Sequence, residues 1–341
     1  MDTSIPYYSD MSRTSNSNIG WFLNKGPTFL HNMLTGKEQG DTGAQLDKGT
    51  MIHEYLLRPE DFAREYILFS GNKPSSAQQE KFCKELINST EIETNKAVLK
   101  AYNKSYSVVG KADKDILTKG LEMAYTLKEY VDISRNCEQN NLTIYSMSES
   151  MLLSKIYNSL TEHKLAYKLF YPDDPDEEWY HEFHINWEQY TKNGVVKCKS
   201  LLDHISFNKR KKICTIVDLK TSVHVNNFEL SMEQYDYYRQ ITYYENAVKW
   251  YIKNVLGEDP NLWTFTSYIV AVDSIKGETC RVFKLDFEND IVKKRESWHK
   301  ILYALTEIMW HISNNLWEHT REYYEGDGSE KLKELSANVP N

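Results

Sequence analysis

The sequence has little glycine, proline and cysteine, and it has no long hydrophobic run. Its 341 residues include 14 glycines and 8 prolines, which excludes a collagen-like or low-complexity chain and favours long regular elements. Because no stretch of about 18 apolar residues occurs, we expect no membrane span. The polar start, MDTSIPYYSDMSRTSNSN, lacks the apolar segment of a secretory signal, so we expect no secretion.

The cysteines stand far apart and form no C-x-x-C pair. Their odd number and wide spacing argue against a disulfide framework or a zinc ribbon and are typical of a reducing compartment. We therefore expect a cytoplasmic protein. The cysteines are Cys83, Cys137, Cys198, Cys214 and Cys280.

The chain also lacks a positive net charge. Lysine and arginine number 41 against 49 acidic residues, which gives −8. This value does not indicate a nucleic-acid-binding protein, but a local basic groove or a bound divalent metal can outweigh the mean charge. The remaining composition is that of a globular protein, with 40% hydrophobic residues, 26% charged residues and 24 tyrosines. A large core in one elaborated domain or two is expected.

The N-terminal half has the periodicity of helices. Residues 15–34 predict a capped helix, a break at Gly26 and a second short helix, followed by a loop to Lys48. The next apolar residues have helical spacing, and Pro59 ends that helix. Residues 76–165 are expected to be mostly helical.

The C-terminal half carries strand signals. WYHEFHINWEQY alternates in polarity and ends in TKNG, which predicts a hairpin. VVKCKSLLDHISF and KKICTIVDLKTSV are β-branched runs joined by the polar turn Asn208–Lys212. A helix is expected over residues 229–256, strands at SYIVAVDS and TCRVFKLDF, and a long helix over residues 289–321, before a loose polar tail.

This order of elements predicts a mixed α/β fold. The hairpins point to a mixed sheet of the α+β kind rather than a doubly wound sheet. We divide the chain into a helical part at 1–165, a mixed-sheet core with flanking helices at 166–325 and a polar tail at 326–341. The first two parts are expected to form one integrated domain.

The sharpest pattern lies on two neighbouring predicted strands. Asp203 ends one strand, and Asp218 and Lys220 end the next, separated by one residue. Residues i and i+2 of a strand face the same side, so Asp218 and Lys220 point to one place. If the two strands pair as a hairpin, Asp203 lies near Asp218. Two converging carboxylates repel unless a cation lies between them, and such oxygen ligands suit Mg²⁺ or Mn²⁺.

An isolated D-x-K triplet is common, and its usual form is a solvated salt bridge on a surface hairpin. The upstream Asp203, the apolar ICTIV run and the motifs around it favour a metal site instead. Leu219 points to the opposite face and leaves its backbone carbonyl available. Lys220 could hold an attacking water or stabilise negative charge on a phosphate.

Five motifs in one order give the chain a resemblance to a known family. They are SNSNIGWFLNKGPTFL, GTMIHEYLLRPEDF, HEFHINW, KSLLDHI with VDLKTS, and YYRQITYYENAV, and they span roughly residues 15–250. Together they resemble the PD-(D/E)XK nuclease core, and more closely the RecE-type (exonuclease VIII-like) phage and prophage exonucleases of its RecB-like branch. Each motif alone is weak, so their common order carries the resemblance. It implies a restriction-endonuclease-like core with a helical N-terminal elaboration.

The resemblance assigns metal ligands and a catalytic lysine. His53, Asp203, Asp218 and the Leu219 carbonyl would hold Mg²⁺, for which Mn²⁺ would substitute, and Lys220 would be the catalytic lysine. Without the resemblance, His53 would be taken for a partly buried helical histidine.

Glu182 completes the expected catalytic set of Asp203, Asp218, Lys220 and Glu182. It would bind a second metal or orient water. An exposed strand carboxylate without such a role is the alternative, and Glu162 is a competitor for the role.

The resemblance also points to residues that contact DNA. Gln240 and Tyr244 lie four residues apart and share one helical face, where they would contact the DNA backbone or support the catalytic lysine. An aromatic core stripe is the alternative. The family often has Arg-Pro before the aspartate of the second motif, whereas this chain has Leu201-Leu202, and Lys199 would replace the missing charge.

The basic run Lys209, Arg210, Lys211 and Lys212 lies in the turn between the two catalytic strands. A charge run is usually a solvated tip, but its position here allows contact with phosphates. Some RecB-branch nucleases hold an iron–sulfur cluster through late cysteines. No cysteine follows Cys280, so we expect no cluster.

The resemblance implies a metal-dependent exodeoxyribonuclease. It would degrade linear double-stranded DNA from its ends, 5′→3′, and leave 3′ single strands for a single-strand annealing protein in phage-type recombination. The compartment would then be the cytoplasm of a bacterial host, and a ring-shaped homo-oligomer would enclose the DNA. Two alternatives stay open, a structure-specific or repair endonuclease on the same core and a nuclease-derived module that binds DNA without cleaving it.

Overall fold

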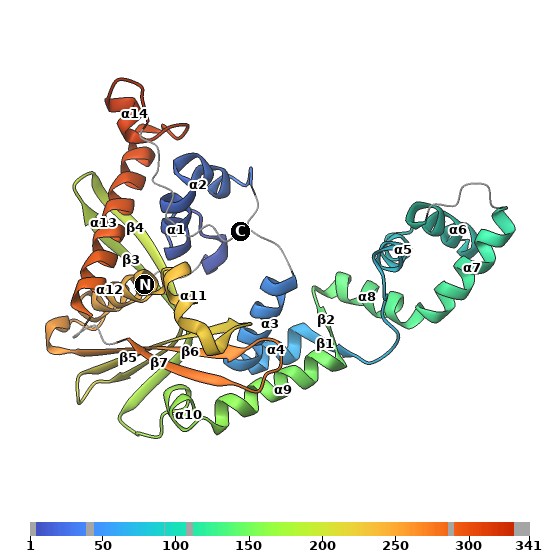
Figure 1. Cartoon of the computed structure of the whole chain (residues 1–341), viewed down its shortest axis with the longest axis horizontal. Helices are drawn as coiled ribbons and strands as arrows, with labels where there is room; N and C mark the ends of the chain where they lie inside the picture. Colours follow the sequence, from blue (N-terminus) through green and yellow to red (C-terminus); the bar gives the residue numbers. More distant parts are fainter. Residues whose placement is uncertain (1–4, 39–43, 92, 107–111, 286–289, 331–341) are drawn as a thin grey trace. The chain divides into compact units, whose positions relative to one another are not determined.

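The computed structural model describes residues 5–38, 44–91, 93–106, 112–285 and 290–330 (Figure 1). It divides into two compact units, which we call the sheet unit (residues 1–53 and 155–341) and the helical unit (residues 54–154). The chain passes between them within two helices, α3 (Ala44–Leu57) and α9 (Met147–Glu162). This grouping differs from a division at residue 165, because the segment up to His53 belongs to the sheet unit.

Five strands of the sheet unit form one mixed sheet in the order β3–β4–β5–β6–β7. β5 and β6 run parallel, and the other neighbouring pairs are antiparallel. A parallel pair needs a crossover, which α11 (Phe228–Gln234) and α12 (Tyr237–Asn254) supply. The strands are β3 (Glu177–Thr191), β4 (Gly194–Asn208), β5 (Ile213–Ser222), β6 (Thr264–Asp273) and β7 (Cys280–Leu285). The predicted mixed α/β fold class is confirmed.

The core of the sheet unit lies between the sheet and its helices, chiefly α12 and α13 (Ile291–Asn314). Apolar residues recur along one stripe of each helix, as expected for helices that cover a sheet. Trp187 of β3, Ile216 of β5, Tyr243 of α12 and Ile301 of α13 are all buried there. This packing holds the central strands, which carry the conspicuous D-x-K residues.

The N-terminal segment continues the sheet beside β4. The β4–β5 ladder covers only the end of β4, from His204 to Asn208. Earlier along β4, Thr14 donates its N–H to the Lys197 carbonyl and accepts from the Lys199 N–H, both at 2.9 Å. The segment therefore covers an edge of β4 that β5 does not reach.

Two short helices follow this segment, as predicted. A capping box between Ser15 and Asn18 begins α1 (Asn16–Lys25). Gly26, at a φ of 90°, ends α1, and Pro27 begins α2 (Pro27–Leu34).

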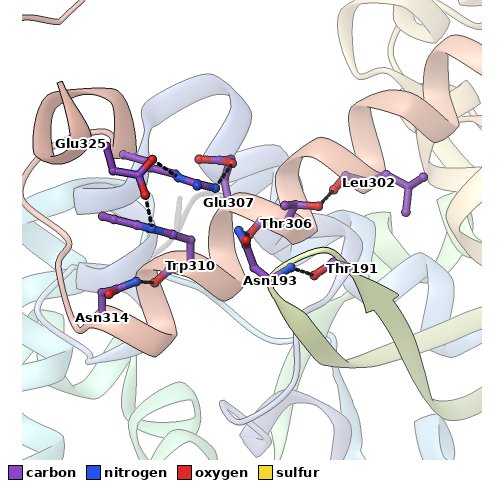
Figure 2. A network of polar contacts seen from close by, with 9 residues as sticks. Thr191, Asn193, Leu302, Thr306, Glu307, Trp310, Asn314 and Glu325 are labelled. Carbon is purple, nitrogen blue, oxygen red and sulfur yellow. Dashed lines mark hydrogen bonds and ion pairs between the residues drawn. The ribbon is translucent and has the colours of Figure 1, made fainter.

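The turn of the β3–β4 hairpin is held by α13 (Figure 2). Asn193 donates its side-chain amide to the Thr306 carbonyl at 2.9 Å, and its own N–H donates to the Thr191 hydroxyl at 3.3 Å. Near the end of α13, the Trp310 indole donates to Glu325 of the short helix α14 (Arg321–Glu325) at 2.9 Å. The Asn193 amide thus fixes the turn of the hairpin to α13, and the Trp310 indole joins α14 to α13.

The helical unit has a small core of its own, in which Phe82, Val98 and Ile116 are buried. Between its helices lie two short strands, β1 (Tyr66–Phe69) and β2 (Thr143–Ser146), which pair in parallel. The expectation of a mostly helical segment omitted β2, since four residues give too short a pattern to separate from helix. The helices are α4 (Pro59–Glu65), α5 (Ala77–Ile87), α6 (Thr94–Ser105), α7 (Asp113–Thr126) and α8 (Lys128–Asn140).

Three element boundaries differ from the sequence expectation. The loop expected up to Lys48 is shorter, since α3 begins at Ala44. The helix expected over 229–256 is two helices, separated at Asp236, whose φ is 51°. The last long helix ends at Asn314 rather than residue 321, because Asn315 adopts a left-handed conformation at a φ of 51°.

The remaining described elements are short: α10 (Lys164–Phe170) and the 3₁₀ turns at Tyr7–Ser9, Val225–Asn227 and Pro260–Leu262. Of the predicted tail, residues 331–341 lie outside the described part of the chain. In the part that is described, no helix combines the length and hydrophobicity that crossing a membrane requires.

The centre of β6 tests this packing. Ile269 is fully buried between β5 and β7, so Ile269→Ala should lower the free energy of unfolding by about 2–5 kcal/mol. Urea unfolding followed by circular dichroism measures the change. As a control, Thr264→Ala alters an exposed residue of the same strand and should change stability by no more than about 0.5 kcal/mol. Equal midpoints for the two variants would contradict the described core.

Candidate active site

Three acidic residues lie side by side on three neighbouring strands, and we call them the acid row (Glu182, Asp203 and Asp218). The β3–β4 ladder pairs His181 with His204 and Phe183 with Leu202, so Glu182 and Asp203 lie at the unpaired position between them. The β4–β5 ladder reaches His204 and Val217, and its next position holds Asp203 and Asp218. Residues opposite each other in a sheet project to the same face. The predicted approach of Asp203 to Asp218 is therefore a consequence of strand register.

Polar contacts from three directions hold the two aspartates. The Lys220 ammonium lies 2.6 Å from Asp218 Oδ2, as the spacing of two along one strand predicted. The Leu219 N–H donates to Asp203 Oδ2 at 2.7 Å. The Gln240 side-chain amide donates to Asp218 Oδ1 at 3.1 Å. β5 and α12 thus fix both carboxylates.

Burial makes the charged forms of both carboxylates unfavourable. Asp218 is only 1% exposed, and burial, reinforced by the nearby Asp203, raises its pKa to about 6 despite Lys220. Burial also raises the pKa of Asp203, against the effects of Lys220 and the Leu219 amide. For Lys220, burial favours the neutral amine, but the attraction of both carboxylates is larger and raises its pKa. The pair of acids is therefore stable in its charged form only beside a cation.

His53 lies beside the acid row, as predicted. Its Nδ1 is 3.9 Å from Asp203 Oδ1, and its side chain is 26% exposed. α3 can approach β5 closely because Gly49 has no side chain, since a Cβ there would lie 3.3 Å from the Thr221 hydroxyl. The glycine and the histidine of one motif thus act together, the first by allowing the approach and the second by facing Asp203.

Glu182 has an unusual backbone. Its φ is 50°, a left-handed conformation that costs energy for a residue with a side chain. The β3–β4 ladder is paired on both sides of it, at His181 and Phe183, but not at Glu182 itself. Strained residues of this kind cluster at functional sites, so the conformation favours the catalytic hypothesis for Glu182 over that of an ordinary strand carboxylate.

Gln240 and Tyr244 share a face of α12, as predicted, but they point inward. Gln240 donates to both Asp218 and the Tyr244 hydroxyl, the latter at 2.9 Å. Tyr244 is 8% exposed. The pair therefore supports the carboxylate of Asp218, while contact with DNA stays a prediction.

Lys199 lies away from the solvent-facing part of the site. It is buried, and its ammonium donates to the carbonyls of Tyr7 and Asp10, both at 2.6 Å. The ammonium also lies 4.7 Å from the centre of the Tyr7 ring. In this structure its charge binds the N-terminal segment to β4, rather than facing a place where DNA could lie.

The basic turn Lys209–Lys212 also has protein partners. The turn begins six residues beyond Asp203, just after the end of β4, roughly 20 Å away at about 3.4 Å per residue. Each of its four side chains pairs with an acid: Lys209 with Glu178, Arg210 with Asp176, Lys211 with Asp174 and Lys212 with Glu258. These surface pairs reduce the charge available to phosphates, and DNA contact by the turn stays a prediction.

The donor chemistry of the acid row fits a hard divalent cation. Each carboxylate oxygen can accept more than one partner, so the contacts of Asp203 and Asp218 leave lone pairs for an ion. A cation would also offset the burial that raises the pKa of both aspartates, and the repulsion from Asp203 that adds to the effect at Asp218. Among the described side chains, however, no three from His, Cys, Asp or Glu are grouped closely enough to hold a metal. The carboxylate oxygens therefore suit Mg²⁺ chemically, although no three of these described side chains are grouped as its ligands.

Sequence reasoning missed two tyrosines near the site. The Lys220 ammonium lies 5.1 Å from the centre of the Tyr237 ring. Burial raises the pKa of Tyr7, and the charges of Glu182 and Asp203 add to that effect. Tyr7 carries no sequence signal, because it reaches the acid row only through the docking of the N-terminal segment. Tyr237 has helical spacing with Gln240 and Tyr244, which could have identified it. The same spacing is expected of a helix face that packs in the core.

No protein-family model and no curated protein matches the sequence. Among solved structures, the chain is similar to the crystal structure of a "putative exonuclease" from Eubacterium rectale, with 12% identity, a TM-score of 0.50 and coverage of 99% of each chain. The crystal structure of SSO0001 aligns with 68% of this chain and 87% of its own, at 11% identity, and its TM-score of 0.24 is too low for any argument. The first similarity shows a shared fold along the whole chain.

The position of Lys199 yields a test. Lys199→Met keeps the apolar stem but leaves two carbonyls without their donor, so the free energy of unfolding should fall by about 1–3 kcal/mol. The segment around Tyr7 should also become sensitive to limited proteolysis. Lys197→Met, an exposed position two residues earlier on β4, is the matched control. If Lys199→Met instead keeps full stability and lowers the salt dependence of DNA binding, Lys199 contacts DNA.

Proposed function

We propose that the protein is a nuclease that hydrolyses phosphodiester bonds of linear double-stranded DNA with the help of Mg²⁺. The observation that carries the proposal is the acid row, in which the half-buried Asp203 and the buried Asp218 lie one position beyond the β4–β5 ladder and Lys220 lies 2.6 Å from Asp218. A structural salt bridge needs one acid and one base. A second, half-buried acid and a strained Glu182 raise the energy of this site without any benefit to folding.

The chain's own groups have distinct roles in this proposal. Asp203, Asp218, His53 and the Leu219 carbonyl would hold the ion, which when bound neutralises phosphate charge and lowers the pKa of water. Lys220 places a fixed positive charge where negative charge develops on the scissile phosphate.

Gln240 and Glu182 would position the other groups. Gln240 holds the rotamer of Asp218 through its hydrogen bond of 3.1 Å, and Tyr244 in turn orients Gln240. Glu182 lies at the end of the acid row, where a carboxylate can accept a proton from the attacking water.

The direction of degradation and the role in recombination are proposed from the family that the ordered motifs resemble. We propose degradation from DNA ends, 5′→3′, which leaves 3′ single strands for an annealing protein in phage-type recombination. The similarity of the whole chain in fold to a protein described as a "putative exonuclease" supports the exonuclease over the endonuclease. A net charge of −8 supports a ring that encloses DNA, because a single copy has no overall attraction for the duplex.

Activity on linear duplex DNA with Mg²⁺ tests the proposal. Asp218→Asn and Lys220→Met should each lower the rate by at least about a hundredfold, the usual loss when a main electrostatic stabiliser is removed. Release of acid-soluble nucleotides measures the rate. Glu188→Gln, an exposed carboxylate on β3 outside the acid row, should leave it unchanged. Equal digestion by all four proteins would point to a contaminant and contradict the proposal.

Substrate topology separates the nuclease classes. Covalently closed circular duplex should stay intact while the linear form of the same DNA is degraded, because an exonuclease needs an end. Nicking or linearisation of the circle would instead assign an endonuclease. Binding of linear DNA without cleavage, with either Mg²⁺ or Mn²⁺, would assign a non-catalytic binding module.

A further inference from the structure

A second polar site lies at the opposite end of the central strands from the acid row. It is a cavity of about 510 Å³ between α12, α13 and the neighbouring ends of β6 and β7. Phe265 of β6 pairs with Cys214 of β5, four residues before Asp218, or roughly 13 Å along the strand. The side chains that matter here are Glu245, Lys249, Phe265, Lys284 and Lys294, and we call this site the lysine pocket.

A buried carboxylate organises the lysine pocket. Glu245 is 1% exposed, and its Oε1 forms ion pairs with the ammonium groups of Lys249 and Lys294, both at 2.7 Å. Its Oε2 is buried and has no hydrogen-bond partner among the described residues. A buried carboxylate oxygen without a donor is costly, so the site is suited to a ligand that brings an N–H or O–H group.

The charge of the lysine pocket is positive. Three ammonium groups face one carboxylate. Lys284 is exposed and has no ion-pair partner in the described part of the chain. Lysine carries three donors, so Lys249, which spends one on Glu245, can also donate to an anion. The pocket therefore combines anion-binding groups with one hydrogen-bond acceptor.

A flat apolar surface completes the site. The Lys249 ammonium lies 5.2 Å from the centre of the half-buried Phe265 ring. An aromatic face beside ammonium groups is the combination on which a nucleobase stacks while its phosphate is neutralised.

We propose that the lysine pocket binds a nucleotide. Its phosphate would contact Lys284 and Lys249, its base would stack on Phe265, and an amino group of the base would donate to Glu245 Oε2. The nucleotide is either one unit of a DNA strand held outside the acid row or a free mononucleotide. The first source rests on the proposed nuclease function, whereas the second does not.

Isothermal titration calorimetry on the full chain in EDTA tests the proposal without any cleavage. The ligands are dAMP, a short oligodeoxyadenylate and inorganic phosphate. Lys284→Glu should weaken nucleotide binding by at least about tenfold, because it places a negative charge beside the phosphate. Lys253→Glu, an equal change at an exposed position of α12 outside the pocket, should change it by no more than about twofold.

A second variant tests the stacking of the base on Phe265. Phe265→Leu keeps an apolar side chain but removes the flat face, and it should weaken dAMP and the oligonucleotide by about tenfold while leaving inorganic phosphate unchanged. If inorganic phosphate binds as tightly as dAMP, the contact of the base with Glu245 is wrong.

The ligands separate the two sources. An effect of Lys284→Glu on the oligonucleotide alone assigns a DNA strand, and an effect on dAMP assigns a free nucleotide. If Lys284→Glu and Lys253→Glu bind both ligands equally, the proposal is overturned. Because the titration in EDTA measures binding without cleavage, a failure to cleave DNA contradicts the nuclease proposal alone, and equal binding by Lys284→Glu and Lys253→Glu contradicts the lysine pocket alone.

Discussion

The removal of two neighbouring carboxylates from water is the constraint on which the rest of the sheet unit depends. Asp203 and Asp218 lie one position beyond the paired residues of β4 and β5, and burial raises the pKa of both. Only a nearby positive charge allows both to be ionised, and Lys220 supplies one such charge from the same strand as Asp218. This arrangement tolerates no error in strand pairing, because a slip of one residue would turn Asp203 to the other face of the sheet.

The basic side chains that the sequence offered as DNA contacts have partners within the protein. Lys199 binds two carbonyls of the N-terminal segment, and each member of the Lys209–Lys212 turn pairs with an acid. A chain with a net charge of −8 can therefore attract phosphates only where cations outnumber their acidic neighbours. The lysine pocket is such a place. In our proposal its aromatic ring would favour a nucleotide over a free phosphate, which a basic patch without an aromatic ring would not do.

Local patterns in the sequence were enough to predict the strands, the hairpin and the shared face of Asp218 and Lys220, because strand periodicity depends only on neighbouring residues. The motif order also placed His53 beside Asp203, although no periodicity could. The burial of Lys199, the strained Glu182 and the approach of Tyr7 could not be foreseen. Each depends on contacts between segments far apart in the chain, and a lysine in a polar stretch looks the same whether it meets DNA or a carbonyl.

The insertion of residues 54–154 within the sheet unit has a consequence for biogenesis. On the ribosome, the first 53 residues must wait while the helical insert and then the strands are made, since His53 and Asp203 are 150 positions apart. Contacts that span such a distance close late and slow the search for the native state. In a nascent chain, the surroundings of the acid row would therefore be completed only after the insert and the strands of the sheet have been made.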